Sequence, residues 1–524
     1  MAHMFGSMGG LGGIMARRAF APAHGGNANR ALTDTPPTFS EVVRGLSWTF
    51  WAAFIGYLGL VALFLLVRGG RSLPGPSSTE EIEGVGKEPE KAGGVWHGWG
   101  KKYGPLFGYT FGSRSFVVAN NLKTAKELLE NRASIYASRP RAVVYHEIIS
   151  DTLDGASGPP TKHWSKWRAV LEAVPSSSPQ FVQEAAHTAR ELLAGKSVEE
   201  AAERYVASCI SVSVYGEDAR VNALDEPVWE AHKGALEGMR EVSKPGLRAV
   251  ETWPFLQHLP PHLQPYLPPL RALRLDAEQT YLTSVLSADS ETPAVGKANE
   301  VGLGEKETAW ALAAPLREGV EPTAAWLRWC IAASLIFPAH LEPIIAETSA
   351  LPHPPTPADL SSLPRTRAFA NECLRYWPTR PVIARATLKE DTWVDRARSR
   401  VYEISKGAGV YVNVDAIVKD EASVESARAF DPERNIEPSE LGVFGLGARK
   451  CPGAKLAETI VVLGFARILY AAHAAIPSGG APPLGNAFEW SGTARGPAKF
   501  EAVFEAREEV AGILRKEREQ WADE

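Results

Sequence analysis

With 524 residues, the chain contains only four cysteines: Cys209, Cys330, Cys373 and Cys451. They are spread too widely for a small disulfide-rich scaffold, and no two of them have the spacing of zinc ligands. We therefore expect a reducing compartment, in which any sulfur chemistry comes from one thiolate acting alone.

The sequence also lacks a basic excess and a built-in electron source. Its net charge is −5, which excludes the global electrostatic signature of a nucleic-acid-binding protein. No flavin- or nicotinamide-binding motif, nor the length for one, remains after Cys451. Electrons for any redox reaction must therefore come from a separate protein.

Charged residues are absent between Arg44 and Arg68, where the run GLSWTFWAAFIGYLGLVALFLLV fills residues 45–67. A helix of this length reaches about 34 Å, enough to cross the roughly 30 Å hydrocarbon core of a bilayer. We predict a transmembrane anchor. A buried core helix is the alternative, and a cleaved signal peptide fits less well because the run starts late and is long.

Residues 1–44 are predicted to be a disordered tail rich in Gly, Ala, Met and Pro. The tail contains Arg17, Arg18 and Arg30 but no acid before Asp34, which is also typical of a mitochondrial presequence. The basic flanks of the anchor favour a cytosolic C-terminal part.

A proline- and glycine-rich linker is predicted for residues 68–94, followed by one catalytic domain over 95–524. Strand-like runs are few (106–119 and 408–413), so we expect a mainly α fold with a small β region. The proline-rich segment 253–270 is predicted to be a loop that lines a substrate entrance at the membrane or packs on the core. Helical periodicity covers 122–137, 162–174, 179–194, 197–214, 226–243, 268–286, 305–349, 364–377 and 453–475.

One segment, FGLGARKCPGAKLAE, carries the strongest chemical signal. It places Cys451 just before a helix that should begin near Gly453, so that backbone N–H groups and the helix dipole favour a thiolate. The neighbouring Arg449 and Lys450 should act in the same direction. The other three cysteines are expected to be buried core residues.

This segment resembles the haem-binding signature of the cytochrome P-450 family, and the similarity covers roughly residues 70–505. In that family the cysteine is the axial ligand of haem b iron, and its thiolate favours O–O cleavage. The resemblance implies a triangular, mainly helical fold and a membrane-bound, microsomal-type haem-thiolate monooxygenase. The matching residues are Phe444, Gly447, Arg449, Cys451 and Gly453.

Two further motifs occur in the family's order. Glu372 and Arg375 lie three residues apart on one helical face, and the resemblance implies that Arg434 joins them in a structural lock under the haem. An ExxR pair alone is uninformative, since many surface helices contain one.

Trp164 and Arg168, one helical turn apart, resemble the family's WxxxR pattern, which implies that both bind a haem propionate. An amphipathic helix with an exposed arginine is the alternative. Arg385 resembles the second propionate-binding position. The segment Ser138-Arg139-Pro140 is similar to the family in spacing.

The oxygen-activation signature departs from the family pattern at Pro322, where a threonine is usual. Glu321 matches the acid of the proton relay, and Thr323 is the nearest hydroxyl. Proline removes an N–H and should kink the helix. Glu318 is larger than the small residue that the pattern expects, while Gly319 should leave room for dioxygen.

The resemblance implies insertion of one oxygen atom from O2 into an apolar small molecule, with NADPH acting through a flavoprotein reductase. A haem-thiolate isomerase, dehydratase or peroxygenase, which needs no reductase, is one alternative, and a non-catalytic haem-binding protein is another. The sequence does not identify the substrate. A basic surface for the reductase is predicted from Lys162, Lys166, Arg449, Lys450 and Lys455.

Overall fold

The computed structural model describes residues 73–77 and 92–522, apart from 112–113, 223, 225, 244–248, 261–266, 397–398, 479, 481–484 and 492–493, and a few isolated positions between 52 and 82. Contacts divide the chain into two units, 1–69 and 70–524, and the elements described below belong to the second. The predicted tail and most of the predicted anchor and linker lie outside the described residues. Within the described part, no single helix is long and apolar enough to cross a bilayer. Two consecutive helical segments, Glu305–Ile336 and Pro338–Ser349, are long and apolar enough together, but the chain bends by 100° between them.

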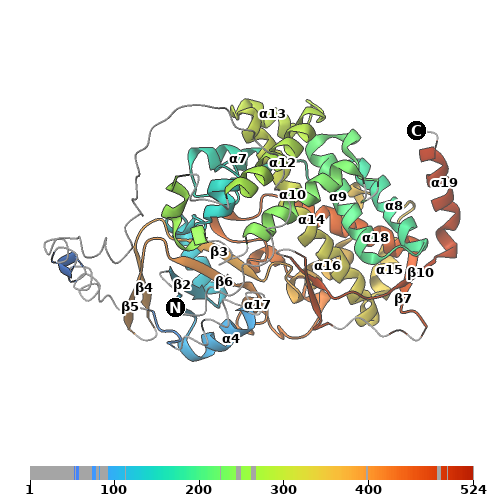
Figure 1. The fold of residues 1–524 in the computed structure, drawn as a ribbon. Coiled ribbons are helices and arrows are strands. Elements are labelled where there is room, and N and C mark those ends of the chain that lie inside the picture. Colours follow the sequence, from blue (N-terminus) through green and yellow to red (C-terminus); the bar gives the residue numbers. More distant parts are fainter. Residues whose placement is uncertain are drawn as a thin grey trace, which may run out of the picture. The chain divides into compact units, whose positions relative to one another are not determined.

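Helices form most of the second unit, as predicted (Figure 1). The longest described helix, α14 (Glu305–Ile336), packs against α9, α12, α16 and α18 and is buried along most of its length, because nearly its whole circumference is apolar. The other helices are α4 (Ala92–Tyr103), α5 (Leu122–Lys126), α6 (Ala133–Tyr136), α7 (Lys162–Glu172), α8 (Gln180–Leu193), α9 (Val198–Tyr215), α10 (Pro227–Ser243), α11 (Ala249–Thr252), α12 (Leu267–Leu286), α13 (Pro293–Glu300), α15 (Glu342–Ser349), α16 (Pro364–Tyr376), α17 (Val414–Ile417), α18 (Ala454–Ala471) and α19 (Ala511–Ala522).

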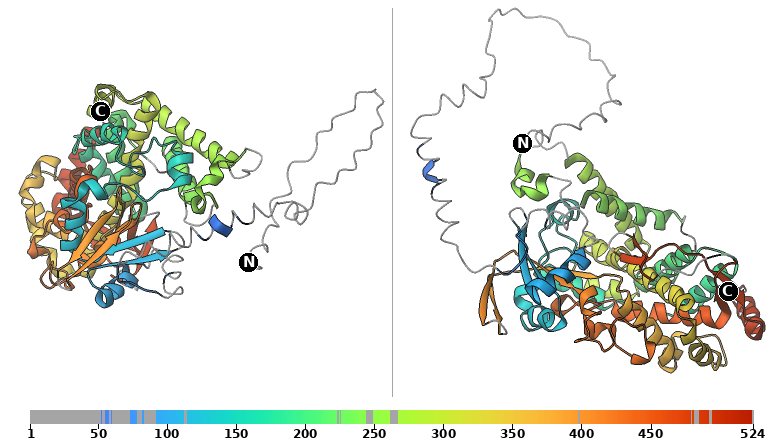
Figure 2. Two further views of the ribbon diagram at one scale, coloured as in Figure 1. Left: turned by 90° about the vertical axis from the view of Figure 1, so that its left-hand side faces the viewer. Right: turned by 90° about the horizontal axis from the view of Figure 1, so that it is seen from below.

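A four-stranded sheet lies beside the helices, with strand order β1-β2-β6-β3 (Figures 1 and 2). Its central pair, β2 and β6, is parallel, while the outer pairs are antiparallel. Trp96 and Trp99 of α4 pack on this sheet through Phe107 and Val118. The strands are β1 (Leu106–Phe111), β2 (Arg114–Ala119), β3 (Val382–Ala386) and β6 (Gly409–Asn413), and three smaller pairs are β4 (Asp391–Asp395) with β5 (Arg400–Ile404), β7 (Ala472–Ala475) with β10 (Val503–Ala506), and β8 (Phe488–Ser491) with β9 (Ala494–Pro497).

Two of the helices predicted from the periodicity of the sequence end earlier in the structure. The pattern at 453–475 ends as a helix at Ala471, because the last residues pair with β10 and tertiary pairing outweighs a weak local preference. The pattern at 305–349 breaks at Phe337, since Pro338 disfavours helical backbone in the residue before it. The helix α14 continues through Pro322, and the kink expected there stays a prediction.

Candidate active site

The loop that precedes α18 comprises residues 444–453 and is called the Cys451 loop. Its backbone requires glycine at position 447. Gly447 has a φ of +67°, in the left-handed region. A Cβ there would lie 1.7 Å from the carbonyl oxygen of Leu129, so no other residue fits without movement. The Cys451 N–H donates to the Phe444 carbonyl (2.8 Å), and the Phe444 ring packs edge-to-face on Trp326 of α14. The loop is thus held between α14 and η2 (Glu127–Asn131).

Cys451 is the one exposed cysteine, whereas Cys209, Cys330 and Cys373 are buried, as predicted for core residues. Burial nevertheless raises the pKa of the Cys451 thiol, so protein surrounds the sulfur on most sides. The sulfur of Cys451 is therefore accessible although protein atoms lie around it on most sides. Open space also lies beside Gly453, where an added Cβ would meet nothing within 4 Å.

Three groups oppose the effect of burial on the pKa of Cys451. The N–H of Gly453 donates to the sulfur, as predicted for the start of α18, and the cations Arg380 and Arg168 lower the pKa further. The sequence pointed to Arg449 for this role, but its guanidinium donates to backbone carbonyls elsewhere. The thiol pKa remains above its usual value.

Arg139, Arg385 and Arg449 form a cluster of like charges, in which Arg385 and Arg449 are buried and Arg139 is half-buried. Burial is the largest cause that lowers the pKa of each guanidinium. Repulsion from Arg139 lowers the pKa of Arg385 and Arg449 further, that of Arg449 to about 9. Buried like charges are unfavourable unless an anion joins them. The two propionates of haem are such a dianion, so the cluster fits the cofactor that the resemblance implies.

Trp164 and Arg168 of α7 both reach the Cys451 loop. The Trp164 ring centre lies 5.0 Å from the Arg449 guanidinium, and Arg168 donates to the Lys450 carbonyl (2.9 Å). Arg168 also forms an ion pair with Glu172 (2.8 Å). The structure therefore brings both residues to the arginine cluster, while their contact with a propionate stays a prediction.

The predicted lock residues lie together. Arg375 binds both carboxylate oxygens of Glu372 (2.7 and 2.8 Å), and the Asp431 N–H donates to the same carboxylate (2.9 Å). Arg434 approaches Glu372 only to 3.7 Å and donates chiefly to backbone carbonyls. The fork-like contact expected of Arg434 is therefore an ion pair without a hydrogen bond.

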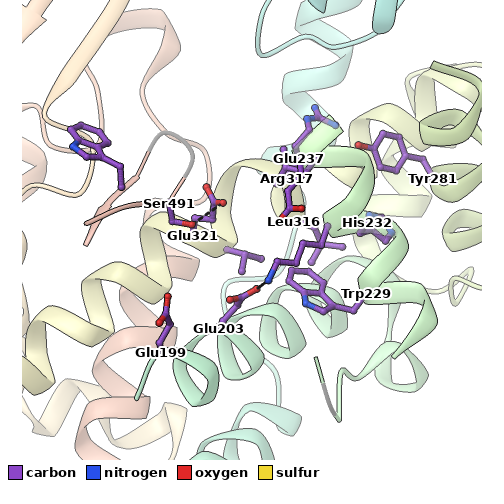
Figure 3. Close-up of a pocket in the computed structure, with 14 residues that line it drawn as sticks. Glu199, Glu203, Trp229, His232, Glu237, Tyr281, Leu316, Arg317, Glu321 and Ser491 are labelled. Carbon is purple, nitrogen blue, oxygen red and sulfur yellow. Dashed lines mark hydrogen bonds and ion pairs between the residues drawn. The ribbon is translucent and has the colours of Figure 1, made fainter. Parts of the chain in front are cut away.

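Glu321 of α14 lines a cavity of about 430 Å³ between α9, α10, α12, α14 and β8 (Figure 3). Its carboxylate accepts a hydrogen bond from Ser491 Oγ (3.1 Å), and the cavity also holds the ion pair of Lys233 with Glu203 (3.0 Å). Thr323 is buried two residues further along α14. The predicted acid and hydroxyl are thus close in sequence, but no direct bond joins them among the interactions of the described residues.

Glu318, which replaces a small residue of the family pattern, forms an ion pair with Arg380 (3.0 Å). The charge of Arg380 lowers the pKa of Cys451 and the charge of Glu318 raises it. At Gly319 an added Cβ would meet the end of the Ile210 side chain of α9 at 3.2 Å, so the missing side chain permits close packing of α14 on α9. The expected space for dioxygen at Gly319 stays a prediction.

Sequence reasoning missed the part that Arg139 and Arg380 play at the site. Arg139 was visible only through the spacing of Ser138-Arg139-Pro140, and Arg380 stands between two recognised motifs without matching either. The position of Arg380 between Arg375 and Arg385 could have indicated that it lies near the site, because a short segment that joins two site residues also passes close to the site.

Four of the five residues of the predicted basic surface are exposed, and its binding of a reductase stays a prediction. Arg449 is 8% exposed and is bonded to carbonyls, so its inclusion was wrong. The local pattern concealed this, because an arginine beside a lysine usually lies at the surface. The exposed members are Lys162, Lys166, Lys450 and Lys455.

The sequence is similar to those of known cytochrome P450 proteins. A family model described as Cytochrome P450 matches residues 274–502. Cytochrome P450 monooxygenase 253 of Postia placenta is 27% identical over 88% of this chain and 94% of that protein. Cytochrome P450 monooxygenase astF of Aspergillus oryzae is 26% identical over 86% of this chain and 88% of that protein.

Solved structures have the same fold. A zebrafish cytochrome P450 determined with abiraterone superposes with a TM-score of 0.65 and 22% identity, covering 79% of this chain and 100% of that chain. Another structure, determined with progesterone, has a TM-score of 0.66, also with 22% identity and 79% of this chain, and covers 99% of that chain. At this identity the likeness concerns the fold alone.

Proposed function

The chain belongs to the cytochrome P450 family and is a monooxygenase of that type, and from this premise we propose that it inserts one oxygen atom from O2 into an apolar small molecule. Two electrons come from a separate NADPH-dependent flavoprotein reductase. The observation that carries the proposal is the accessible sulfur of Cys451 beside the cluster of arginines.

In this proposal the chain's own residues hold haem b. Cys451 ligates the iron, and the open side of Gly453 admits the flat macrocycle. Arg139, Arg385 and Arg449 neutralise the propionates, and their repulsion is relieved when the dianion is present. The bound haem supplies the oxygen-transfer chemistry, which a thiolate ligand favours.

Other residues orient the loop and supply polar groups. Trp164 and Arg168 complete the propionate site from α7, and Phe444 shields the sulfur from water. Glu321, which accepts a hydrogen bond from Ser491, is the candidate acid of the proton relay, and Thr323 is the nearest hydroxyl on the same helix. The lock of Glu372 and Arg375, with Arg434, keeps α16 and the following chain in place.

The decisive test is a carbon monoxide difference spectrum of the reduced protein with a Cys451→Ser control. A red-shifted Soret band of the thiolate type is expected for the native chain and should be lost in the variant. A band that survives the substitution would overturn the ligand assignment. Consumption of NADPH and O2 that depends on a small molecule and on added reductase tests the reaction.

Pro322 favours a second candidate function, that of a haem-thiolate isomerase, dehydratase or peroxygenase. Because proline stands where the family's usual threonine supports dioxygen chemistry, the chain has lost that hydroxyl from its usual position. Product formation without reductase would favour this candidate. Product formation that requires NADPH, O2 and reductase would exclude it.

We further propose that residues 45–67 anchor the protein in the endoplasmic reticulum membrane, after a tail at 1–44, with a linker at 68–94 and the catalytic domain at 95–524 in the cytosol. Trp253 and Phe255 are 54% and 63% exposed, which supports a substrate entrance at the membrane surface. Resistance to carbonate extraction, lost on deletion of residues 45–67, tests the anchor. Import into mitochondria would favour the presequence alternative.

A further inference from the structure

The cavity at Glu321 has an exposed acidic side and a buried aromatic side. Its volume is about 430 Å³, and its lining ranges from exposed residues such as Glu237 and Ser491 to Trp229 and Tyr281, which are 7% and 1% exposed (Figure 3). A cavity of this size accepts a small molecule. A molecule held in it would lie beside the candidate acid of the proton relay.

His232 of α10 lies on the buried side of this cavity and is 7% exposed. Its ring stacks on Tyr281, with the ring centres 5.4 Å apart, and its Nε2 lies 2.8 Å from Oγ of Ser284. These two contacts with α12 fix the orientation of the ring. Nδ1 of His232 has no hydrogen-bond partner among the described residues, so one ring nitrogen remains for a ligand.

The hydrogen bonds of Ser284 decide which ring nitrogen of His232 carries the proton. Ser284 Oγ donates to the Thr280 carbonyl (3.1 Å), which can only accept, and a hydroxyl has one hydrogen to give. Nε2 of His232 must therefore donate to Ser284, which leaves a lone pair on Nδ1. Burial, and next the charge of Arg317, lower the pKa of His232 to about 4, so the ring is neutral at neutral pH. Nδ1 is thus a buried hydrogen-bond acceptor without a donor.

The surroundings of this acceptor favour a neutral donor. Burial and the charge of Arg317 disfavour a proton on the imidazole, and for the same reasons they disfavour an ammonium group beside it. Lys233 is already paired with Glu203 (3.0 Å). Arg317 is likewise paired with Asp154 (2.9 Å), so the charges of both cations are compensated, and Glu321 repels an anionic ligand.

A second unpaired group lies one helical turn away. Trp229 also lines the cavity from α10, and its Nε1–H is buried without a hydrogen-bond partner among the residues that the structure describes. Residues three positions apart lie on the same face of a helix, so the indole of Trp229 and the imidazole of His232 are neighbours. A hydroxyl can donate to the imidazole and accept from the indole through one oxygen, whereas an ether or a ketone can only accept.

We propose that this cavity binds a hydroxyl group of an apolar substrate, with Nδ1 of His232 as the acceptor and Ser284 as the residue that fixes the tautomer of its ring. The apolar part of the substrate packs on Leu316 and Val320 of α14, which are buried and line the same cavity. This inference rests on the proposed function and refines its apolar substrate to an alcohol.

Hydroxyl recognition is tested by calorimetric titration of the full-length holoenzyme with 1-octanol and with its isomer methyl heptyl ether, which cannot donate a hydrogen bond. We expect octanol to bind about fivefold more tightly, the usual effect of one neutral hydrogen bond. Octanoate should bind at least about tenfold more weakly than octanol, because its charge is repelled and loses its hydration. Equal binding of the two isomers, undetectable binding of octanol, or tighter binding of octanoate overturns the proposal.

Two variants locate the preference for octanol. His232→Phe keeps an aromatic ring but has no acceptor, so the preference should fall below about twofold. Ser284→Ala releases Nε2 and lets the ring proton move to Nδ1, where it can donate to the ether oxygen, so the preference should fall here too. His473→Phe, at an exposed position, is the matched control and should keep the full preference.

A preference that persists in His232→Phe overturns the contact, and one that persists in Ser284→Ala overturns the assigned tautomer. If His232→Phe does not retain haem, His232→Asn takes its place. The amide oxygen of asparagine can accept where Nδ1 does, so part of the preference should remain, and its complete loss with Ser284→Ala unaffected would overturn the proposal.

Failure of the proposed function is distinguishable from failure of this inference. Absence of the thiolate-type carbon monoxide spectrum from the native protein would refute the former, while the calorimetric comparison needs no turnover. An intact spectrum with no preference for octanol overturns hydroxyl recognition alone.

Discussion

Arg375 binds Glu372 through two hydrogen bonds, from Nε to Oε2 (2.7 Å) and from Nη2 to Oε1 (2.8 Å), with side chains that are 0% and 2% exposed. Nη1 of Arg375 donates to the carbonyls of Val418 and Ala427 (2.8 Å each). These bonds tie α16 to the chain that leads into the Cys451 loop. Removal of either charge leaves the other buried and uncompensated.

Glu372→Ala should therefore lower the free energy of unfolding by about 3–5 kcal/mol, as for other broken buried ion pairs. Urea unfolding measures the change. Glu300→Ala is the control, because Glu300 forms an ion pair with Lys297 in which the side chains are 67% and 32% exposed. It should cost less than about 1 kcal/mol. Similar losses for both variants would contradict the structural role of the lock.

The buried side chain of His232 should make the free energy of unfolding depend on pH. Burial, and next the charge of Arg317, lower the pKa of His232 from 6.5 to about 4. Between these pH values the unfolded chain binds a proton that the folded chain does not, so stability is full above pH 6.5 and falls as pH decreases to about 4. This group should account for a loss of about 2 kcal/mol between pH 7 and pH 5.

His232→Phe should remove that part of the pH dependence while the ring continues to stack on Tyr281. Unfolding at the two pH values measures the difference. His473→Phe, at an exposed position, is the control and should leave the slope unchanged. An unaltered slope in His232→Phe would contradict the assignment.

Arg385→Gln should have opposite effects on the two forms of the protein. Without haem, the variant should be as stable as the native chain or more so, because burial and repulsion from Arg139 and Arg449 disfavour the Arg385 charge. With haem, affinity should fall by about tenfold or more, since a charge-assisted hydrogen bond is lost. Unfolding of both forms and haem transfer to apomyoglobin measure the effects. Arg141→Gln, at an exposed ion pair, should change neither.

Charge reversal at Lys162 and Lys450 should slow electron transfer from the reductase by roughly tenfold at low ionic strength, and salt should reduce the difference. Both lysines are exposed. Stopped-flow reduction across a salt series measures the rates. Lys406→Glu, an exposed lysine in the β5–β6 turn, is the control of equal charge. Rates that do not respond to Lys162→Glu and Lys450→Glu would exclude this surface.

Local patterns were sufficient to predict the position of Cys451 just before α18, the contact of Glu372 with Arg375 and most helix boundaries. Each of these depends on residues within a few positions of one another, where helical spacing and glycine placement are visible. Arg449 shows where prediction from local patterns fails. Its burial depends on carbonyls of Gly155 and Ala156, which are far away in the sequence, so nothing beside it signalled that the charge lies inside.

The Glu318–Arg380 contact is a second case. The sequence showed that Pro322 removes an N–H, and from this a kink was expected. It could not show that a guanidinium from the segment after α16 would donate to the Glu318 carbonyl, whose helical donor is missing. Tertiary donors that repair a helix have no periodicity, so only the structure reveals them.

Two glycines that flank Cys451 should respond to alanine in different ways. Gly447→Ala places a Cβ 1.7 Å from the Leu129 carbonyl at a φ of +67°, so the loop must move and stability should fall by more than about 2 kcal/mol. Gly453→Ala meets nothing within 4 Å at a φ of −91°, so the haem-free chain should lose no more than about 0.5 kcal/mol.

The haem-free chain should tolerate Gly453→Ala, but the haem-bound form should not. If the open space there admits the flat face of haem, the added methyl group intrudes on it, and Gly453→Ala should retain less haem although its polypeptide is stable. Unfolding of the haem-free proteins and the ratio of Soret to protein absorbance after purification separate the two effects. Full haem content in Gly453→Ala would show that the cofactor does not approach this backbone, and it would move the predicted haem plane away from the start of α18.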